Sequence, residues 1–213
     1  MKLYSYWRSS SAYRVRIALN LKGIAHEIVP VHLVRDGGEQ HAPAYRALNP
    51  HGLVPLLVDG EARISQSMAI LDYLERRAPE PALLPGDGAA RAQRLSACYT
   101  IACETQPLQN LRVLQHLTGP LGHDEAEKAA WARHWIEAGL RVFEQQVAAQ
   151  AGACCFGDAP GWADCLLVPQ MYNAERFGCA LDDCPTIRRV TDHLRTLPAV
   201  AAAHPDRQPD AAG

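Results

Sequence analysis

The apolar positions of the chain follow different patterns before and after residue 80. In the first part, short half-apolar runs alternate with stretches of helical spacing. Residues 3–6 and 27–31 have the pattern of strands, and residues 13–21 between them place their apolar side chains on one face of a helix. This order predicts a helical crossover between two parallel strands.

A predicted hairpin and a further helix follow. Residues 56–58 and 62–64 are apolar runs on either side of Asp59-Gly60, a pair typical of a tight turn. Ser67 comes next and is expected to cap a helix. The order β-α-β-(α)-β-β-α, with a parallel crossover first and a hairpin later, predicts a thioredoxin-like α/β domain over residues 1–80.

Beyond this domain the strand patterns disappear. Residues 81–88 are predicted to be a linker, because prolines and glycines are concentrated there. Residues 89–213 are predicted to form a helical domain. The predicted fold class is an α/β N-terminal thioredoxin-like domain followed by an all-α C-terminal domain.

Helix-breaking and helix-starting residues subdivide the second domain. Residues 91–116 have a helical pattern that Pro107 should kink, because proline lacks an N–H and crowds the preceding turn. The capping-box spacing of residues 124–127 predicts the start of another helix. Pro169 is expected to interrupt the mostly apolar helix that follows, and residues 206–213 are expected to form a loose tail.

Charge and cysteine usage narrow the function classes. With 21 lysines and arginines against 23 acidic residues, the chain has no basic field that would favour nucleic acid or an anionic membrane. No apolar run reaches the roughly 20 residues that cross a bilayer, and no signal-peptide pattern opens the chain. The seven cysteines are an odd number without a C-x-x-C pair and are expected to be reduced thiols in a cytoplasmic protein. The scattered histidines indicate no metal site.

The strongest candidate chemistry lies where the first strand meets the first helix. Arg8 is followed by three serines at positions 9–11, and an amphipathic helix begins there. Hydroxyls and free backbone N–H groups converge at a helix N-terminus, whose dipole favours a bound anion and a thiolate in particular. Arg14 and Arg16 either add positive charge nearby or form a solvated face. The alternative is that the serines only cap the helix.

A second group of polar features lies around the predicted hairpin. Pro55 stands at the start of a strand, and a cis Val54–Pro55 bond would let Val54 offer its N–H and C=O to an extended peptide. A trans proline at a sheet edge is the alternative. Gln66 offers an amide, and the helix start at Ser67 suits a carboxylate. Together these features describe a peptide-like ligand with its anionic end at Ser67 and a sulfur near Ser9.

Taken together, these residues and several later segments resemble the zeta-class glutathione transferases. Two positions depart from that pattern. Ser11 stands where the family usually has cysteine, and Gly161 stands where Ser or Thr usually caps a helix. The resemblance is carried, in order along almost the whole chain, by residues 8–19, 47–50, 54–55, 66–67, 106–110, 167–170, 173–177 and 204–205.

The resemblance implies that glutathione is the cofactor and that Ser9 is the main donor to its thiolate. Arg8 and Arg176 are interpreted as ligands for the carboxylates of a small dicarboxylate substrate, because the planar fork of arginine suits a carboxylate. For Arg176 the alternative is a salt bridge to the turn of Glu175 or to Asp182. The implied catalytic set is Arg8, Ser9, Ser10, Ser11 and Arg176, and the implied glutathione contacts are Ser9, Ser10, Ser11, Gln40, Val54, Pro55, Gln66, Ser67, Gln106, Asn110, Leu111 and Arg112.

The activity implied by the resemblance is a glutathione-dependent cis–trans isomerisation. Reversible addition of the thiolate to a double bond would convert maleylacetoacetate to fumarylacetoacetate in aromatic amino acid catabolism, in a homodimeric enzyme. The alternatives are maleylpyruvate isomerisation in the gentisate route and a general transferase or dehalogenase of small α-halo acids. A non-catalytic interaction module is disfavoured, because Gln66, Ser67 and Arg176 are retained together with the serines. A glutaredoxin-like oxidoreductase would need a cysteine at Ser9 or Ser10.

Overall fold

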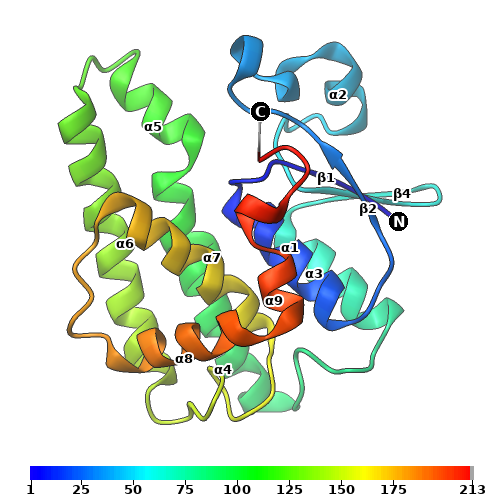
Figure 1. Ribbon diagram of the computed structural model, residues 1–213, viewed down its shortest axis with the longest axis vertical. Coiled ribbons are helices and arrows are strands. Elements are labelled where there is room, and N and C mark those ends of the chain that lie inside the picture. Colours follow the sequence, from blue (N-terminus) through cyan, green and yellow to red (C-terminus); the bar gives the residue numbers. More distant parts are fainter. Residues whose placement is uncertain (212–213) are drawn as a thin grey trace. The chain divides into compact units, whose positions relative to one another are not determined.

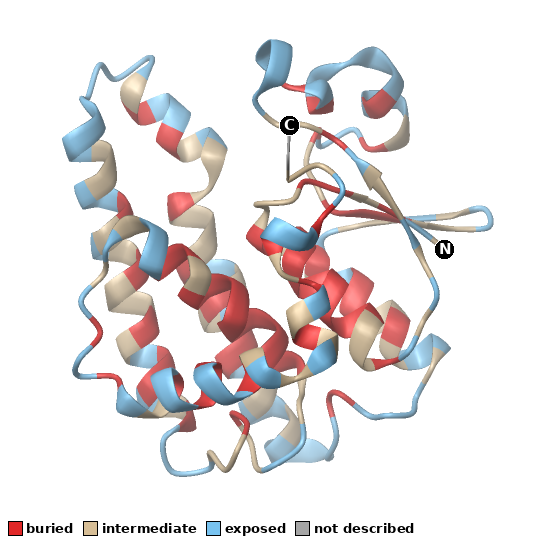
Figure 2. Cartoon of the chain, viewed as in Figure 1, coloured by how far each residue is buried: buried red, intermediate tan, exposed pale blue. Residues whose placement is uncertain are grey.

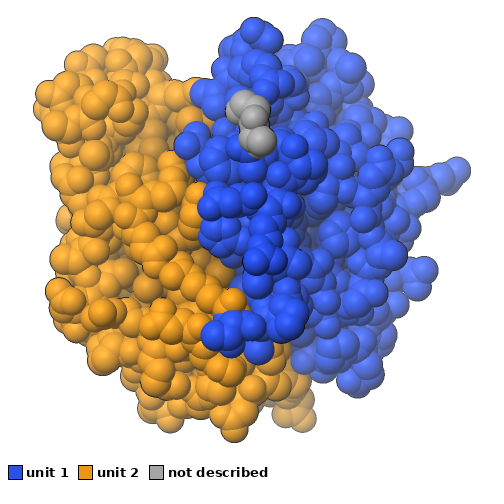
Figure 3. All heavy atoms as spheres, viewed as in Figure 1, with its two compact units in different colours: residues 1–83, 196–213 blue, residues 84–195 orange. Residues whose placement is uncertain are grey.

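The computed structural model describes residues 1–211 of the 213-residue chain. The chain forms two compact units, which Figure 3 shows in different colours. The first unit contains Met1–Leu83 and the C-terminal segment from Thr196, and the second contains Leu84–Arg195. The division predicted from the sequence differs in that it assigned all of residues 89–213 to the helical domain.

A four-stranded sheet is the frame of the first unit. Its strand order is β2-β1-β3-β4, with β1 parallel to β2 and the other two pairings antiparallel. A helical crossover joins the two parallel strands and a hairpin follows, which confirms the thioredoxin-like prediction. The strands are β1 (Lys2–Ser5), β2 (Glu27–Pro30), β3 (Leu56–Asp59) and β4 (Ala62–Ser65).

Helices cover both faces of this sheet. Because side chains alternate along a strand, Leu3 and Leu57 point to one face, where both are fully buried and where α1 and α3 lie side by side (Figure 1). On the other face, Tyr45 of α2 packs in a cluster with Tyr4 and Leu56. The helices are α1 (Ser10–Leu21), α2 (Pro43–Leu48) and α3 (Ser67–Arg77), with short 3-10 turns η1 (Arg35–Gly37) and η2 (Glu39–His41).

The C-terminal segment packs on α1 and so returns to the first unit. It contains α9 (Pro198–Ala202) and the 3-10 turn η5 (Pro205–Arg207). Arg16 Nε donates to the carbonyl of Ala203 at 3.1 Å, and Trp7 N donates to Asp210 Oδ2 at 2.9 Å. The expected loose tail is therefore wrong for residues 206–211, and residues 212–213 lie outside the described residues.

The second unit is helical, as predicted. Its first predicted helix is not merely kinked but divided into separate elements. In place of one segment over 91–116, an α-helix is followed by a π-type turn, a 3-10 turn that contains Pro107, and a separate α-helix. These pieces are α4 (Gly88–Tyr99), η3 (Thr100–Thr105), η4 (Gln106–Gln109) and α5 (Leu111–Thr118), and the later helices are α6 (Glu125–Val147), α7 (Trp162–Phe177) and α8 (Pro185–Thr196).

At two helix starts, hydrogen bonds from nearby side chains determine where the helix begins. The predicted capping box at α6 is present, since Glu127 N donates to Asp124 Oδ1 at 2.8 Å and Asp124 N donates to Glu127 Oε2 at 3.0 Å. At α7 only half of such a box exists, because the cap is Gly161. Asp164 Oδ2 accepts from Gly161 N at 2.8 Å, and its other oxygen accepts from Cys155 N at 2.8 Å. Burial raises the pKa of this carboxyl.

The helix α7 is buried along most of its length (Figure 2). It runs through Pro169 without ending there, so the expected interruption is wrong. An internal proline costs about 3 kcal/mol, and burial of the surrounding apolar side chains outweighs that cost.

None of the helices in the described part of the chain combines the length and the apolar character that a bilayer crossing requires.

Candidate functional site

Strand pairing brings several predicted site residues of the first unit together at one end of the strands. Tyr4 of β1 pairs with Leu56 of β3, and Leu56 pairs with Ser65 of β4. The loops that leave β1, enter β3 and leave β4 therefore lie side by side. These loops carry, respectively, Arg8 and the serines, Val54-Pro55, and Gln66 with Ser67.

Ser9 is the N-cap of α1. Its Oγ accepts from Ala12 N at 3.2 Å, so Ser9 does cap the helix, as one of the two interpretations expected. A hydroxyl can accept and donate at once, and capping uses only an acceptor position of Ser9. The Ser9 O–H can therefore still donate to an anion at the helix N-terminus. Ser10 is buried beside it and Ser11 is half-buried.

Arg16 fixes the backbone of the turn that carries Ser9. Its guanidinium donates to Ser5 Oγ at 3.0 Å and to the carbonyl of Trp7 at 2.9 Å, and it is 1% exposed. The alternative of a solvated arginine face is wrong, because the side chain lies under the turn. Arg8 follows Trp7, and its guanidinium lies 4.9 Å from the centre of the Trp7 ring.

The segment before β3 is anchored by two side chains of the α2 region. Tyr45 Oη donates to the carbonyl of Leu53 at 2.7 Å, and Asn49 Nδ2 donates to the same oxygen at 2.8 Å. Burial raises the pKa of Tyr45 to about 12, so it stays a donor. The Val54–Pro55 bond is cis, which decides between the two interpretations of this proline. Within residues 1–211, no hydrogen bond involves the backbone of Val54.

Ser67 is not the cap of α3 that the sequence predicted. Gln66, not Ser67, is the N-cap of α3, and its backbone lies in the left-handed region at φ 72°. Ser67 is the buried first residue of the helix, and its Oγ accepts from Arg14 Nη1 at 3.2 Å. Arg14 is itself 2% exposed. The sequence did not indicate that a buried cation contacts Ser67.

Gln40 lies in η2, on the chain that follows β2. Its Nε2 donates to the carbonyl of Leu33 at 3.2 Å, and its Oε1 is buried without a hydrogen-bond partner in the described residues. Gly38 lies against this side chain with φ 103°, and a Cβ there would collide with the Gln40 amide. The glycine therefore allows Gln40 to fold inward.

The remaining predicted residues belong to the second unit. Gln106 is the first residue of η4, and Asn110 caps α5 by accepting from Arg112 N at 3.2 Å. Arg176 is exposed near the end of α7, and its Nη1 donates to Asn173 Oδ1 at 3.0 Å.

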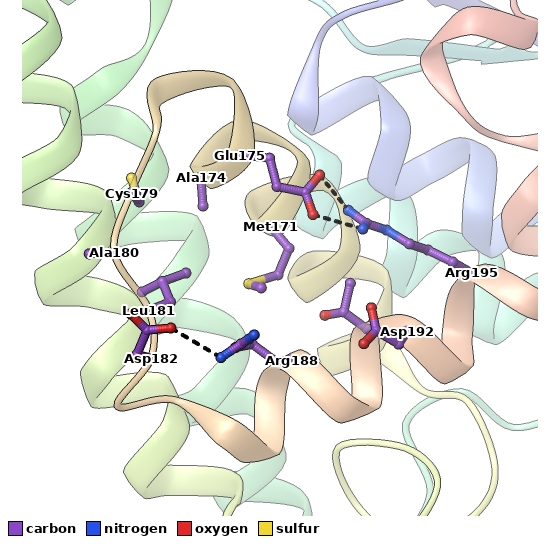
Figure 4. Close-up of a pocket in the computed structure, with 11 residues that line it drawn as sticks. Met171, Ala174, Glu175, Cys179, Ala180, Leu181, Asp182, Arg188, Asp192 and Arg195 are labelled. Atoms are coloured by element: carbon purple, nitrogen blue, oxygen red, sulfur yellow. Dashed lines mark hydrogen bonds and ion pairs between the residues drawn. The ribbon is translucent and has the colours of Figure 1, made fainter.

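The two carboxylates considered as partners for Arg176 are paired with other arginines. Arg195 donates to both oxygens of Glu175, at 2.7 and 2.9 Å, and Arg188 contacts Asp182 at 3.4 Å (Figure 4). These side chains line a cavity formed by α7, the loop after it and α8. None of the predicted site residues lines that cavity.

The cysteines give no sign of redox or metal chemistry. None of the seven forms a disulfide bond among the described residues, and Cys154 and Cys155 are fully buried. Burial raises the pKa of Cys154 to about 12 and that of Cys155 well above the usual value. No group of metal-binding side chains occurs in residues 1–211.

The chain is similar in sequence to several known proteins. Residues 3–82 match the family described as Glutathione S-transferase, N-terminal domain. A maleylacetoacetate isomerase from Pseudomonas aeruginosa is 52% identical over 211 residues, which cover 99% of this chain and 98% of that protein.

Two solved structures have the same fold over 99% of both chains. A maleyl pyruvate isomerase, described as a bacterial glutathione S-transferase in Zeta class, matches with a TM-score of 0.95 at 42% identity. A maleylacetoacetate isomerase from Methylobacterium extorquens AM1, with bound malonate and glutathione, matches with a TM-score of 0.94 at 42% identity.

Proposed function

Because the chain belongs to the zeta-class glutathione transferase family, we propose that it is a glutathione-dependent cis–trans isomerase that converts maleylacetoacetate to fumarylacetoacetate. The observation that carries this proposal is the turn at Ser9, a hydroxyl at a helix N-terminus in a chain 52% identical to a maleylacetoacetate isomerase. Glutathione is the cofactor, as in the solved relative that binds it together with a dicarboxylate.

The residues of the first unit suit an extended peptide with a thiolate at one end. Ser9 O–H, with Ser10 and Ser11 beside it, is the donor to the sulfur. The backbone of Val54, preceding Pro55, has no hydrogen bond among the described residues and suits pairing with an added strand. The γ-glutamyl carboxylate is assigned to the start of α3, where Ser67 and Gln66 meet the positive end of the helix dipole.

Gln40 completes this set from the neighbouring loop, since it is buried with an amide oxygen that has no described partner. From the second unit we assign Gln106, Asn110, Leu111 and Arg112 to glutathione, on the family resemblance and on their place at the η4–α5 junction.

The chain's own contribution to the reaction is to keep the sulfur ionised and to place the substrate. When bound, glutathione would supply a thiolate nucleophile for reversible addition to the double bond conjugated to a carbonyl, and would not be consumed. The Ser9 hydroxyl and the N-terminus of α1 favour the charged sulfur over the thiol. Arg8 and Arg176 bind the two substrate carboxylates and stabilise the negative charge that develops on the carbonyl oxygen.

An ultraviolet assay of maleylacetoacetate with and without glutathione tests the proposal. We expect turnover that requires glutathione while its concentration stays constant. Consumption of glutathione, or turnover without it, would contradict the isomerase mechanism. The same assay with maleylpyruvate ranks the second candidate substrate, which the 42% identity to a maleyl pyruvate isomerase supports.

Replacement of Arg176 by alanine tests its assignment to the substrate. The KM for the dicarboxylate should rise at least about tenfold, as expected for a charged contact of more than about 1.4 kcal/mol, and glutathione affinity should not change. Isomerase kinetics equal to those of the wild type would remove Arg176 from the site.

We further infer a cytoplasmic homodimer, on the family resemblance and on the seven cysteines, which form no disulfide bond among the described residues and so suit a reducing compartment. Light scattering on the purified protein and fractionation of the source cells test these two statements.

A further inference from the structure

Three buried amide side chains form a continuous row that ends at Arg176. Asn173 Oδ1 accepts from Arg176 Nη1 at 3.0 Å, and Asn173 Nδ2 donates to Gln109 Oε1 at 2.9 Å. Gln109 Nε2 in turn donates to Gln170 Oε1 at 3.3 Å. None of the three amides is more than 5% exposed. The row joins η4 to α7 through the interior of the second unit.

Arg176 determines the direction of every hydrogen bond in this row. A guanidinium only donates, so Asn173 must turn its carbonyl oxygen toward Arg176. The amide nitrogen of Asn173 therefore faces Gln109 and donates to its oxygen. The amide nitrogen of Gln109 then donates to the oxygen of Gln170. The orientation of these amides, which is ambiguous for an isolated side chain, is thereby settled.

Filling the interior with this row of amides is energetically unfavourable compared with filling it with apolar side chains. Gln170 Nε2, at its far end, is a buried donor without a hydrogen-bond partner in the described residues. Burial of such a group is unfavourable, and apolar side chains of similar volume would fill the same space without that penalty. An effect on the orientation of Arg176 explains the row better than a contribution to stability does.

The side chain that Asn173 presents to Arg176 is also neutral. The nearby carboxylates of Glu175 and Asp182 pair with Arg195 and Arg188 (Figure 4). An amide oxygen orients a guanidinium without cancelling its charge, whereas a carboxylate would do both. The hydrogen bond to Asn173 therefore orients the guanidinium of Arg176 without itself neutralising it.

We propose that Asn173 and Gln109 are positioning residues that orient Arg176 toward one carboxylate of the substrate. The inference rests on the proposed function, in which Arg176 binds that carboxylate. Asn173 sets the guanidinium by direct contact, and Gln109 sets the amide of Asn173.

Malonate binding to the glutathione-saturated protein, measured by calorimetry, tests the proposal without requiring turnover. Asn173→Asp keeps the shape of the side chain but pairs the guanidinium with a carboxylate, so the Kd for malonate should rise about tenfold. Gln109→Ala should raise it by about threefold. In an Arg176→Ala background neither change should have a further effect, because the coupling passes through that side chain.

Controls separate positioning from general damage. The glutathione Kd and the unfolding midpoint should stay near the wild-type values in Gln109→Ala. Gln150→Glu adds the same negative charge at an exposed position outside the row and should leave the malonate Kd unchanged. In the isomerase assay, the two row variants should raise the KM for the dicarboxylate and leave the KM for glutathione unchanged.

The outcomes also distinguish this inference from the proposed function. Wild-type malonate affinity in Asn173→Asp, or an equal loss in the Arg176→Ala background, would overturn the positioning role. If Asn173→Asp does not fold, Gln109→Ala decides the question by the same readouts. Absence of malonate binding in the wild type overturns the inference as well. If malonate binds through Arg176 but neither maleyl substrate is isomerised, the proposed function fails while the positioning role stands.

Discussion

Ser9 combines two tasks in one hydroxyl group. Its oxygen accepts from Ala12 N and so caps α1, while its hydrogen can still donate to an anion beyond the helix end. Capping holds the hydroxyl in place, and this makes it a better donor for the proposed thiolate. A structural role and a functional role therefore do not compete at this residue.

Two substitutions at Ser9 separate these tasks. Ser9→Ala removes both and should lower the free energy of unfolding by about 1 kcal/mol, whereas Ser9→Gly should cost only about a few tenths, because glycine is tolerated at an N-cap. Both should raise the thiol pKa of bound glutathione, which an ultraviolet titration measures. A thiol pKa unchanged in both variants would reject the role assigned to Ser9.

Gln66 offers a similar separation through its backbone. At φ 72° a side chain with a Cβ is strained, by about 1–3 kcal/mol, and glycine is not. Gln66→Gly should therefore keep or raise the unfolding free energy while it weakens glutathione binding about tenfold through loss of the amide. Gln66→Ala should weaken binding equally without any gain in stability. Chemical denaturation and calorimetry measure the two quantities, and wild-type affinity in both variants would exclude the amide contact.

At the scale of elements, close approach between helices depends on single small residues. Gly139 lies in α6 where this helix meets the π-type turn η3, and a Cβ at this position would collide with the side chain of Thr105. The turn itself is closed by Thr105 Oγ1, which donates to the carbonyl of Thr100 at 2.8 Å. The irregular turn and the glycine therefore belong to the same helix contact.

Gly139→Ala tests this contact. Overpacking of this kind costs about 1–3 kcal/mol, so we expect a loss of that size in chemical denaturation. The double variant with Thr105→Ala, which removes the two nearest colliding atoms, should recover part of it. Equal stability of Gly139→Ala and the wild type would show that α6 and η3 have room to separate.

Over the whole molecule, the cysteines differ in how deeply their thiols are buried. Cys103 is exposed, whereas burial raises the pKa of Cys154 to about 12 and those of Cys179 and Cys184 to about 11. Only the thiolate is nucleophilic, so a raised pKa leaves little reactive form near neutral pH. The distribution of thiols thus predicts one dominant reactive cysteine.

A short iodoacetamide pulse at about pH 8, analysed by peptide mass spectrometry, tests this prediction. Cys103 should be alkylated first. Labelling of Cys179, which is only partly buried, should increase as the pH is raised toward 11, the value near which its thiol ionises. Labelling of Cys154 at the rate of Cys103 would show that its surroundings open in solution.

Most features that depend on short stretches of chain could be predicted from the sequence. The hairpin around Asp59-Gly60 and the capping box at Asp124 follow from the backbone conformations and hydrogen bonds of adjacent residues. The sequence around Pro55 allows either a cis or a trans bond and favours Ser67 as the cap of α3, whereas the structure has a cis bond and Gln66 at the N-cap position. Predictions were least accurate where a residue's role depends on what packs against it, as with the burial of Arg14 under Ser67.

The sequence by itself determined the order of strands and helices and the candidate residues at their ends, because periodicity, capping and turn formation act between neighbours in the chain. The tertiary structure alone decided that Arg176 contacts Asn173 while Glu175 pairs with Arg195, and that the C-terminal segment returns to α1. A charged side chain can reach several partners that lie close in the sequence. Which of them it meets depends on how distant elements pack.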